Sequence, residues 1–172
     1  GGESYLRQEG RGLCIGFYEQ KCEPWAVDGT PWDFGHELLN DAFEKIEDSV
    51  SFAYRRFPVL ERAGVKRVIH GPFTFAPDGN PLVGPVPARE EFLQTFAGLR
   101  NNARQRIDSR GDYVPGLYLN TAHGSRGLTS TPLAGELLAG LICGEPLPLP
   151  RSLCRALTPA RFLIRDLSRG RI

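Results

Sequence analysis

The residue types best suited to chemistry gather in one loop of small and polar residues, which begins at Ala122 and leads into a segment of helical character. His123 and Arg126 give the loop polar and cationic reach. Gly124 and Gly127 permit positive φ angles and a close approach of the backbone to a ligand. A helix that begins there exposes unpaired backbone N–H groups, which either a hydroxyl side chain caps or an anionic ligand group binds. The spacing alone leaves both interpretations open.

Two apolar segments must position this loop. Residues 116–119 form a short apolar run that predicts a buried strand before the loop. Residues 132–141 predict a helix after it, because their leucine and alanine side chains recur at helical intervals. This order of strand, loop and helix places the backbone donors of the helix beside the polar side chains of the loop.

The rest of the chain carries further strand and helix signals. The clearest is residues 37–57, where apolar side chains recur every three or four residues until Pro58 interrupts the pattern. The run Pro77-Asp-Gly-Asn-Pro81 predicts a turn. The remaining predictions are two short strands within residues 5–18 around a turn at Glu9 and Gly10, strands at residues 65–70 and 82–84, and a helix within residues 89–107.

Length and composition limit the function only broadly. A chain of 172 residues can bury a real core, and a net charge of +1 with 24% charged residues indicates no acidic or basic partner. No apolar run is long enough to span a bilayer, so we expect no membrane partner. The histidines are too scattered to predict a metal site. These features indicate an α/β or α+β domain with one anion- or cofactor-facing helix end, and they identify no reaction.

Two blocks of sequence resemble the D-amino-acid-oxidase-like superfamily of FAD-dependent oxidoreductases. Residues 4–87 resemble the dimethylglycine and sarcosine dehydrogenase group, above all in the run from Val68-Ile-His-Gly-Pro-Phe to Pro-Leu-Val-Gly-Pro-Val-Pro87. Residues 88–172 are similar to the end of the flavin module of the bifunctional tRNA 5-methylaminomethyl-2-thiouridine biosynthesis enzyme. The matching pieces there are Gly116-Leu-Tyr-Leu-Asn, the run from Ala122 to Leu138, Ile142-Cys-Gly-Glu-Pro and Leu157-Thr-Pro-Ala-Arg. Either a hybrid or an unusual member with mixed features accounts for the change near residues 85–87.

The resemblance implies an α/β fold in two parts. Residues 1–87 would form the end of an α+β substrate domain, and residues 88–172 the C-terminal part of a Rossmann-like FAD-binding domain. The strand and G-x-G-x-x-G turn that seat the ADP pyrophosphate in this superfamily have no counterpart in the sequence. We therefore expect a fragment whose partner is the missing N-terminal FAD-binding half, and which binds FAD weakly or not at all by itself.

Both resemblances imply the same chemistry, the oxidation of the C–N bond of an N-substituted glycine by hydride transfer to FAD, followed by hydrolysis of the resulting imine. The substrate is then either a small amine such as dimethylglycine or sarcosine, or the carboxymethylaminomethyl group of a tRNA wobble uridine. A non-catalytic regulatory or tRNA-binding module that keeps the fold is the alternative.

The resemblance also implies which residues form the site. Loop and helix residues would line the flavin, with the positive helix end stabilising negative charge on the reduced ring. Phe73 occupies the place where the tRNA enzyme and glycine oxidase carry a carboxylate-binding arginine, as expected of the dehydrogenase group. Arg126 either pairs with a substrate carboxylate or packs against the loop. The predicted cofactor-binding residues are His123, Gly124, Ser125, Arg126, Gly127, Leu128, Thr129 and Ser130, and the predicted substrate-binding residues are Phe73 and Arg126.

The C-terminal segment is rich in arginine, and this feature bears on the choice of substrate. Its positive charges either contact tRNA phosphates or belong to a solvated, partly amphipathic terminal segment. The location that we expect is the cytoplasm, with the mitochondrial matrix as the alternative if the dehydrogenase resemblance governs. The arginines concerned are Arg151, Arg155, Arg161, Arg165, Arg169 and Arg171.

Overall fold

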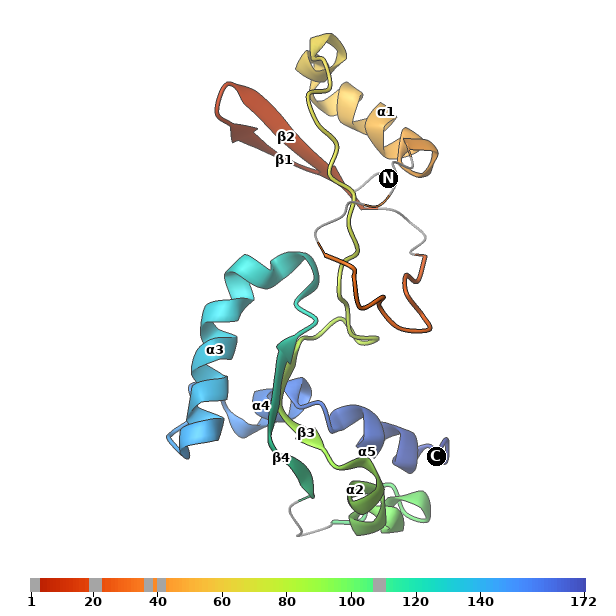
Figure 1. The fold of residues 1–172 in the computed structure, drawn as a ribbon, viewed down its shortest axis with the longest axis vertical. Coiled ribbons are helices and arrows are strands. Elements are labelled where there is room, and N and C mark those ends of the chain that lie inside the picture. Colours follow the sequence, from red (N-terminus) through yellow and green to blue (C-terminus); the bar gives the residue numbers. More distant parts are fainter. Residues whose placement is uncertain (1–3, 19–22, 36–38, 40–42, 107–110) are drawn as a thin grey trace. The chain divides into compact units, whose positions relative to one another are not determined.

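The computed structural model describes residues 4–18, 23–35, 39, 43–106 and 111–172. The chain divides into two compact units, residues 1–72 and residues 73–172 (Figure 1). Helices and small antiparallel sheets alternate along it, which confirms the predicted α/β class. The division between the units precedes the domain boundary that we predicted after residue 87, and the roles predicted for the two domains stay predictions.

The first unit opens with a β-hairpin, as predicted. Strand β1 (Ser4–Glu9) pairs antiparallel with β2 (Gly12–Phe17), and Gly10 takes a φ of +57° in the turn. Tyr5 lies opposite Gly16, and a Cβ at Gly16 would overlap the Tyr5 ring. The glycine thus makes room for an aromatic side chain on the neighbouring strand.

The predicted helix of this unit is confirmed over its second half. Helix α1 (Glu47–Arg56) follows the 3-10 turn η1 (Phe43–Lys45), and η2 (Pro58–Arg62) begins at the predicted helix breaker. Residues 36–38 and 40–42 of the predicted span lie outside the described residues. Ala53 is buried on the apolar side of α1, as the helical spacing requires.

The strand predicted at residues 65–70 is wrong. These residues are described, and none of them belongs to a strand. Val65 and Ile69 are 77% and 70% exposed, so their apolar side chains have no sheet face to cover. The described part of this unit offers no strand that pairs with the segment, and β-branched residues without a pairing strand do not make a strand.

The second unit is built on a two-stranded antiparallel sheet. Strand β3 (Leu82–Pro87) extends the predicted short strand, and it pairs with β4 (Tyr113–Thr121) from Leu82 opposite Thr121 onward. The predicted strand at residues 116–119 lies inside β4. Its predicted burial is wrong, because Leu117 is 47% exposed and helix packing covers only part of the strand.

Helix α3 (Gly127–Cys143) packs along this sheet (Figure 1). It begins before Pro132, where we predicted its start, so the last four predicted flavin-facing residues belong to the helix and not to the loop. Gly144 ends the helix in the left-handed conformation with a φ of +70°. Leu137 and Ala134 of α3 join Val83 of β3 in the buried core of the unit.

Among the remaining helices, α4 (Arg151–Leu157) adds Cys154 and Leu157 to this core. The helix predicted within residues 89–107 is shorter than expected and consists of α2 (Arg89–Thr95) and the 3-10 turn η3 (Ala97–Arg100). Phe92 of α2 is buried, with ring centroids 4.5 Å from Phe96 and 5.9 Å from Tyr113. Helices α4 and α5 (Arg161–Ser168) end the chain.

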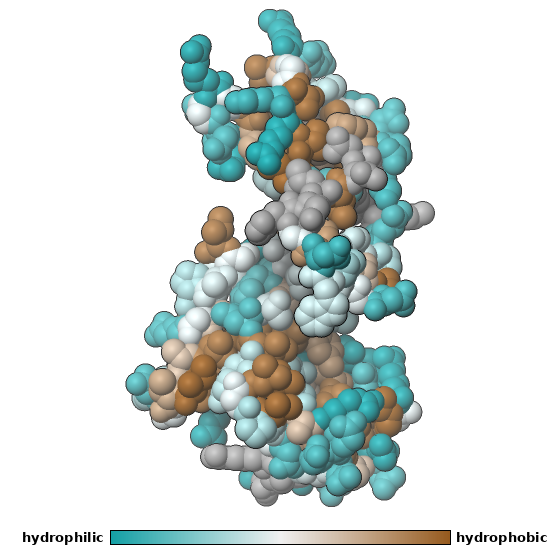
Figure 2. All heavy atoms as spheres, in the orientation of Figure 1, coloured by the Kyte–Doolittle hydropathy of each residue, from teal (hydrophilic) through white to brown (hydrophobic). Residues whose placement is uncertain are grey.

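Apolar side chains also reach the surface of the second unit, where brown atoms are visible between polar areas in Figure 2. On α3, Leu128 is 99% and Leu133 43% exposed, in contrast to the fully buried Leu137 of the same helix. Within the described ranges, no helix combines the length and hydropathy needed to cross a membrane.

The contrast between Leu137 and Leu133 gives a test of this core. Leu137→Ala should lower the free energy of unfolding by about 2–5 kcal/mol, because it leaves a cavity between α3 and the sheet. Leu133→Ala, on the exposed side of the same helix, should change it by less than about 1 kcal/mol. Urea unfolding followed by circular dichroism measures both values, and equal losses would contradict the placement of α3.

Candidate functional site

The predicted cofactor-binding residues form one continuous corner between β4 and α3. His123 follows the strand, η4 (Gly124–Arg126) makes the turn, and residues 127–130 form the first turn of α3. Ser125, Arg126, Leu128 and Thr129 are exposed, whereas His123 and Ser130 are partly buried. The arrangement of strand, turn and helix that the sequence predicts is therefore present, with a shorter loop than expected.

The turn between strand and helix needs unusual backbone angles. Ala122 has a φ of +61° although it carries a Cβ, and it is 4% exposed. A residue with a side chain in this conformation stores roughly 1–2 kcal/mol of strain. Gly124 follows with a φ of +55°, where glycine has no such cost. The strain at Ala122 lies in the segment predicted to face the ligand, and such strain persists only where surrounding contacts hold it.

No side chain caps the N-terminal end of α3, which continues directly from η4. Its N-cap is Arg126, whose side chain makes no capping hydrogen bond. The nearby hydroxyls do not serve the first-turn N–H groups either: Ser130 Oγ donates to the Arg126 carbonyl at 2.9 Å, and Thr131 Oγ1 donates to the Gly127 carbonyl at 2.6 Å. These contacts show no hydroxyl cap at this helix end, and binding of an anionic group there stays a prediction.

A segment from before the Asp-Gly turn lies against this corner. Gly124 N donates to the Thr74 carbonyl at 3.1 Å, and Phe75 forms an isolated antiparallel bridge with His123. A Cβ at Gly124 would overlap the Phe75 ring, so this position must be glycine for the two segments to approach. The rings of Phe73 and Phe75 lie 6.1 Å apart and are 65% and 52% exposed. The structure thus brings the segment of Phe73 beside the predicted flavin-facing loop.

His123 connects the strand to the helix through both of its ring nitrogens. Nδ1 lies 2.8 Å from Ser130 Oγ on α3, and Nε2 lies 2.8 Å from Asn120 Oδ1 on β4. Ser130 in turn donates to the carbonyl of Arg126. A short hydrogen-bonded chain therefore runs from the end of the strand to the residue that precedes α3.

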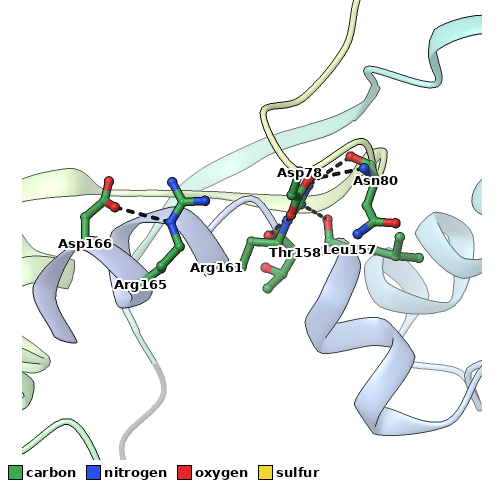
Figure 3. Close-up of polar contacts among 7 residues, drawn as sticks. All are labelled: Asp78, Asn80, Leu157, Thr158, Arg161, Arg165 and Asp166. Atoms are coloured by element: carbon green, nitrogen blue, oxygen red, sulfur yellow. Dashed lines mark hydrogen bonds and ion pairs between the residues drawn. The ribbon is translucent and has the colours of Figure 1, made fainter. Parts of the chain in front are cut away.

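A second polar contact fixes the segment that carries the phenylalanines (Figure 3). Arg161 at the start of α5 donates from Nε and Nη2 to the two carboxylate oxygens of Asp78, at 2.8 and 2.9 Å. Its remaining N–H groups bond the backbone carbonyls of Asn80, Leu157 and Thr158 at 2.9 to 3.1 Å. All the N–H donors of the guanidinium are thus used, and they tie the predicted turn at residues 77–81 to the junction of α4 and α5.

This contact also shifts the ionisation of the carboxylate. The hydrogen bond from Arg161 is the main cause that lowers the pKa of Asp78 to about 2, and partial burial opposes it. The side chains of Arg161 and Asp78 are 11% and 30% exposed, so solvent screens the pair only in part. Within the turn, Asn80 N donates to Asp78 Oδ1 and Gly79 N donates to the Ala76 carbonyl. The turn prediction is confirmed.

The arginine-rich C-terminal segment divides into two groups. Arg161 is fully engaged, Arg165 lies 3.3 Å from Asp166 and over the Phe162 ring, and Arg171 lies 4.0 Å from the same carboxylate. These contacts agree with the predicted partly amphipathic segment, in which Leu167 is fully buried. Contact with tRNA stays a prediction, and the exposed arginines that remain for it are Arg151, Arg155 and Arg169.

Sequence reasoning missed several residues that shape the site. Phe75, Asn120 and Arg161 were not singled out for it, although each contacts the loop or its support. A local signal existed only for the Pro-Asp-Gly turn, whose carboxylate needs a partner. The partner itself lies far along the chain, and no local pattern names it.

Comparison with known proteins identifies the family. The family model described as FAD dependent oxidoreductase (DAO) matches residues 1–141. The chain belongs to this family. Its members depend on FAD, which confirms the cofactor expected from the resemblance. Among the described residues, no group of three or more histidine, cysteine, aspartate or glutamate side chains is arranged to hold a metal ion.

Several bacterial relatives share one name, tRNA 5-methylaminomethyl-2-thiouridine biosynthesis bifunctional protein MnmC. The protein of Pseudomonas aeruginosa (strain UCBPP-PA14) is 56% identical over 150 residues, which is 83% of this chain and 23% of the relative. That of Pseudomonas paraeruginosa (strain DSM 24068 / PA7) is also 56% identical over 150 residues. That of Stutzerimonas stutzeri (strain A1501) is 50% identical over 95 residues, 55% of this chain and 14% of the relative.

The coverage of these matches refines the resemblance. Residues 88–172 alone cannot account for 83% of the chain, so the similarity to the P. aeruginosa enzyme extends into residues 1–87. One family member therefore matches parts of both blocks. The chain spans 23% of the length of that relative, so the match covers only a part of the protein to which the name refers.

The residues at the corner fit the cofactor of the family. The helix end without a side-chain cap and the exposed Arg126 would offer positive potential, which suits a planar ring whose edge gains negative charge on reduction. A Cβ at Gly127 would meet only the His123 Cβ, at 3.7 Å, so the backbone there is open to close approach. The seat of the ADP part of FAD is not among these residues.

The two glycines of the corner give a matched test. Gly124→Ala should lower the free energy of unfolding by more than about 1 kcal/mol, because a Cβ is strained at this φ and also overlaps Phe75. Gly127→Ala, at a helical φ of −53°, should be neutral or stabilising by up to about 1 kcal/mol. Chemical denaturation measures both changes. Similar values for the two variants would contradict the described turn, and Phe75→Ala should relieve part of the loss in Gly124→Ala.

The ion pair of Asp78 predicts a pH dependence. A lowered folded-state pKa stabilises the protein above the unfolded-state value of about 4, and this contribution is lost as the pH falls toward 2. Asp78→Asn should therefore lower the free energy of unfolding at pH 7 by about 1–3 kcal/mol and flatten its decline between about pH 4 and pH 2. Urea unfolding across this range provides the measurement.

The control for this prediction is Glu90→Gln. Glu90 pairs with Arg89 at 3.7 Å on the surface, with side chains 75% and 57% exposed. An exposed pair of this kind contributes little, so the variant should change the free energy of unfolding by less than about 1 kcal/mol. Asp78→Asn and wild-type curves that run parallel down to pH 2 would show that the pair is not formed in solution.

Proposed function

We propose that this chain is the C-terminal part of the flavin module of an enzyme that oxidises the C–N bond of the carboxymethylaminomethyl group on a tRNA wobble uridine. The observation that carries the proposal is the 56% identity to the P. aeruginosa tRNA-modification enzyme over 83% of the chain. The end of α3, which no side chain caps and which lies at the position expected to face the flavin, supports it.

FAD would supply the two-electron acceptor for oxidation of the C–N bond. The residues of this chain would place donors and positive potential beside the ring. Residues 123–130 form the surface proposed to face it, at a helix end that no side chain caps. Arg126, exposed at the N-cap, is the proposed partner of the substrate carboxylate.

Phe73 is proposed to line the substrate side of the site. Its segment is held next to the loop by the Gly124–Thr74 hydrogen bond, and its ring is largely exposed. A phenylalanine cannot bind a carboxylate, so in this proposal the anionic end of the substrate turns to Arg126. The dehydrogenase resemblance of this position leaves dimethylglycine or sarcosine as the competing substrate class.

A module without catalysis, which regulates or binds tRNA, is the competing class of function. The exposed Arg151, Arg155 and Arg169 are the observation that favours tRNA contact, because arginine pairs readily with phosphates. The cytoplasm is the location that goes with the proposed function. The relatives named above are bacterial, and they give no support to a mitochondrial location.

A chimera tests the proposal. This chain would replace the matching segment of the P. aeruginosa relative, which supplies the remaining length of the protein. We expect the chimera to purify with a flavin absorbance spectrum, whereas the 172-residue chain by itself should bind added FAD at least about tenfold more weakly, because it supplies only part of the contacts to the cofactor.

Anaerobic flavin bleaching then identifies the substrate. We expect tRNA that carries the carboxymethylaminomethyl uridine to bleach the flavin, and sarcosine and dimethylglycine to leave it oxidised. The unmodified tRNA serves as the control. Bleaching by sarcosine alone would assign the dehydrogenase substrate class, and a folded chimera without flavin would support the non-catalytic module.

A further inference from the structure

We propose that His123 is a positioning residue that, together with Asn120 and Ser130, locks the corner between β4 and α3. The sequence and the resemblance place His123 among the residues that line the flavin. The structure gives it a different task, because its ring links two elements of this chain. The role for flavin chemistry rests on the proposed function, whereas the bridge itself rests on the geometry.

The first step concerns the hydrogen bonds of the two ring nitrogens of His123. A neutral imidazole has one donor and one acceptor nitrogen, and both lie 2.8 Å from a polar atom of the chain. Ser130 Oγ donates its one proton to the Arg126 carbonyl, so it accepts from His123 Nδ1–H, and Nε2 faces the Asn120 amide. Both ring nitrogens are thus engaged within the chain, as expected of a residue that positions its neighbours.

The second step is what the bridge restrains. Ser130 lies in the first turn of α3 and donates to the carbonyl of Arg126, the N-cap residue. Asn120 lies on β4, two residues before the strained Ala122. The chain of hydrogen bonds thus spans the left-handed turn from both sides. It fixes the direction of the first-turn N–H groups and the backbone of Arg126 relative to the strand.

The third step is that the segment of Phe75 holds the other face of the corner, by ring packing and by one backbone hydrogen bond. Phe75 covers Gly124, and Gly124 N donates to Thr74. These contacts hold the middle of the turn, whereas the imidazole holds its two ends. A change at Asn120 or Ser130 should therefore loosen the direction of α3 without removing the turn itself.

The bridge is tested on the whole 172-residue chain by ¹⁵N NMR of the imidazole rings, which is practical because the chain has only three histidines. We expect Asn120→Ala to move the Nε2 signal of His123 and Ser130→Ala to move its Nδ1 signal. Both variants should also shift the backbone amides of residues 126–130. Unchanged ring signals in both variants would overturn the proposal.

Matched controls separate the bridge from general loss of polar groups. Thr131→Val removes a hydroxyl that donates to a carbonyl one turn back, as Ser130 does, but that is not bonded to His123. Asn102→Ala removes an amide whose oxygen accepts from Arg104 N, nearby in the sequence. Both controls should leave the His123 ring signals in place.

Two substitutions of His123 ask whether both links are needed. His123→Asn can place an amide near the position of Nδ1, and His123→Gln can place one near the position of Nε2. Each variant keeps one link at most, so neither should show the wild-type NMR chemical shifts of the backbone amides of residues 126–130. Full restoration by either variant would show that the bridge is not required.

The flavin-loaded chimera gives the readout for function. Asn120→Ala and Ser130→Ala should slow flavin reduction roughly ten- to hundredfold, as expected for misplaced supporting groups. The shape of the pH–rate profile should stay the same, since no proton-transfer group is lost, and loss of one limb in His123→Gln would contradict a positioning role.

Wild-type rates of flavin reduction in both Asn120→Ala and Ser130→Ala would overturn the inference while the proposed function stands. A chimera without flavin overturns the proposed function, and the NMR result still decides the bridge.

Discussion

The corner between β4 and α3 depends on the contact between Arg161 and Asp78. A guanidinium that is 11% exposed must satisfy all its N–H groups, and here a carboxylate and three backbone carbonyls do so. The contact is planar and bidentate, which fixes direction as well as distance. Lysine could not replace this arginine, because its ammonium has three donors and no fixed plane. The turn at residues 77–81 is therefore held to the junction of α4 and α5 with little freedom.

The held turn determines where the preceding segment runs. Phe75 can cover Gly124 only if its backbone lies beside His123, and that requires the Asp-Gly turn in its observed place. The glycine and the aromatic ring are complementary, since one supplies the space that the other fills. Three distant stretches of sequence thus meet at one corner. Within it, His123 links Asn120 to Ser130 through its two ring nitrogens. Contacts of this kind offset the backbone strain of Ala122 in the folded protein.

Local sequence signals predicted the elements better than their partners. The hairpin, the Asp-Gly turn and the order of strand and helix around His123 follow from turn residues and apolar spacing, and the structure confirms them. The start of α3 was placed too late, because Pro132 resembles a helix start although the residues before it are already helical. The strand at residues 65–70 was wrong for a different reason: its β-branched residues favour a strand, but no described strand pairs with it. Arg161 looked like one of several tail arginines, since burial and a partner far along the chain are invisible in local pattern.

The tail now carries two different kinds of arginine, and this matters for any contact with tRNA. An arginine whose donors are all bonded within the chain cannot also bind a phosphate without breaking those bonds, so Arg161 adds structure and not affinity. The exposed Arg151 and Arg155 lie four residues apart on α4 and therefore share one side of that helix. The match to the family model ends at residue 141, before both groups. The segment beyond that match nevertheless supports the corner between β4 and α3, because Arg161 binds the Asp-Gly turn that follows the segment of Phe75.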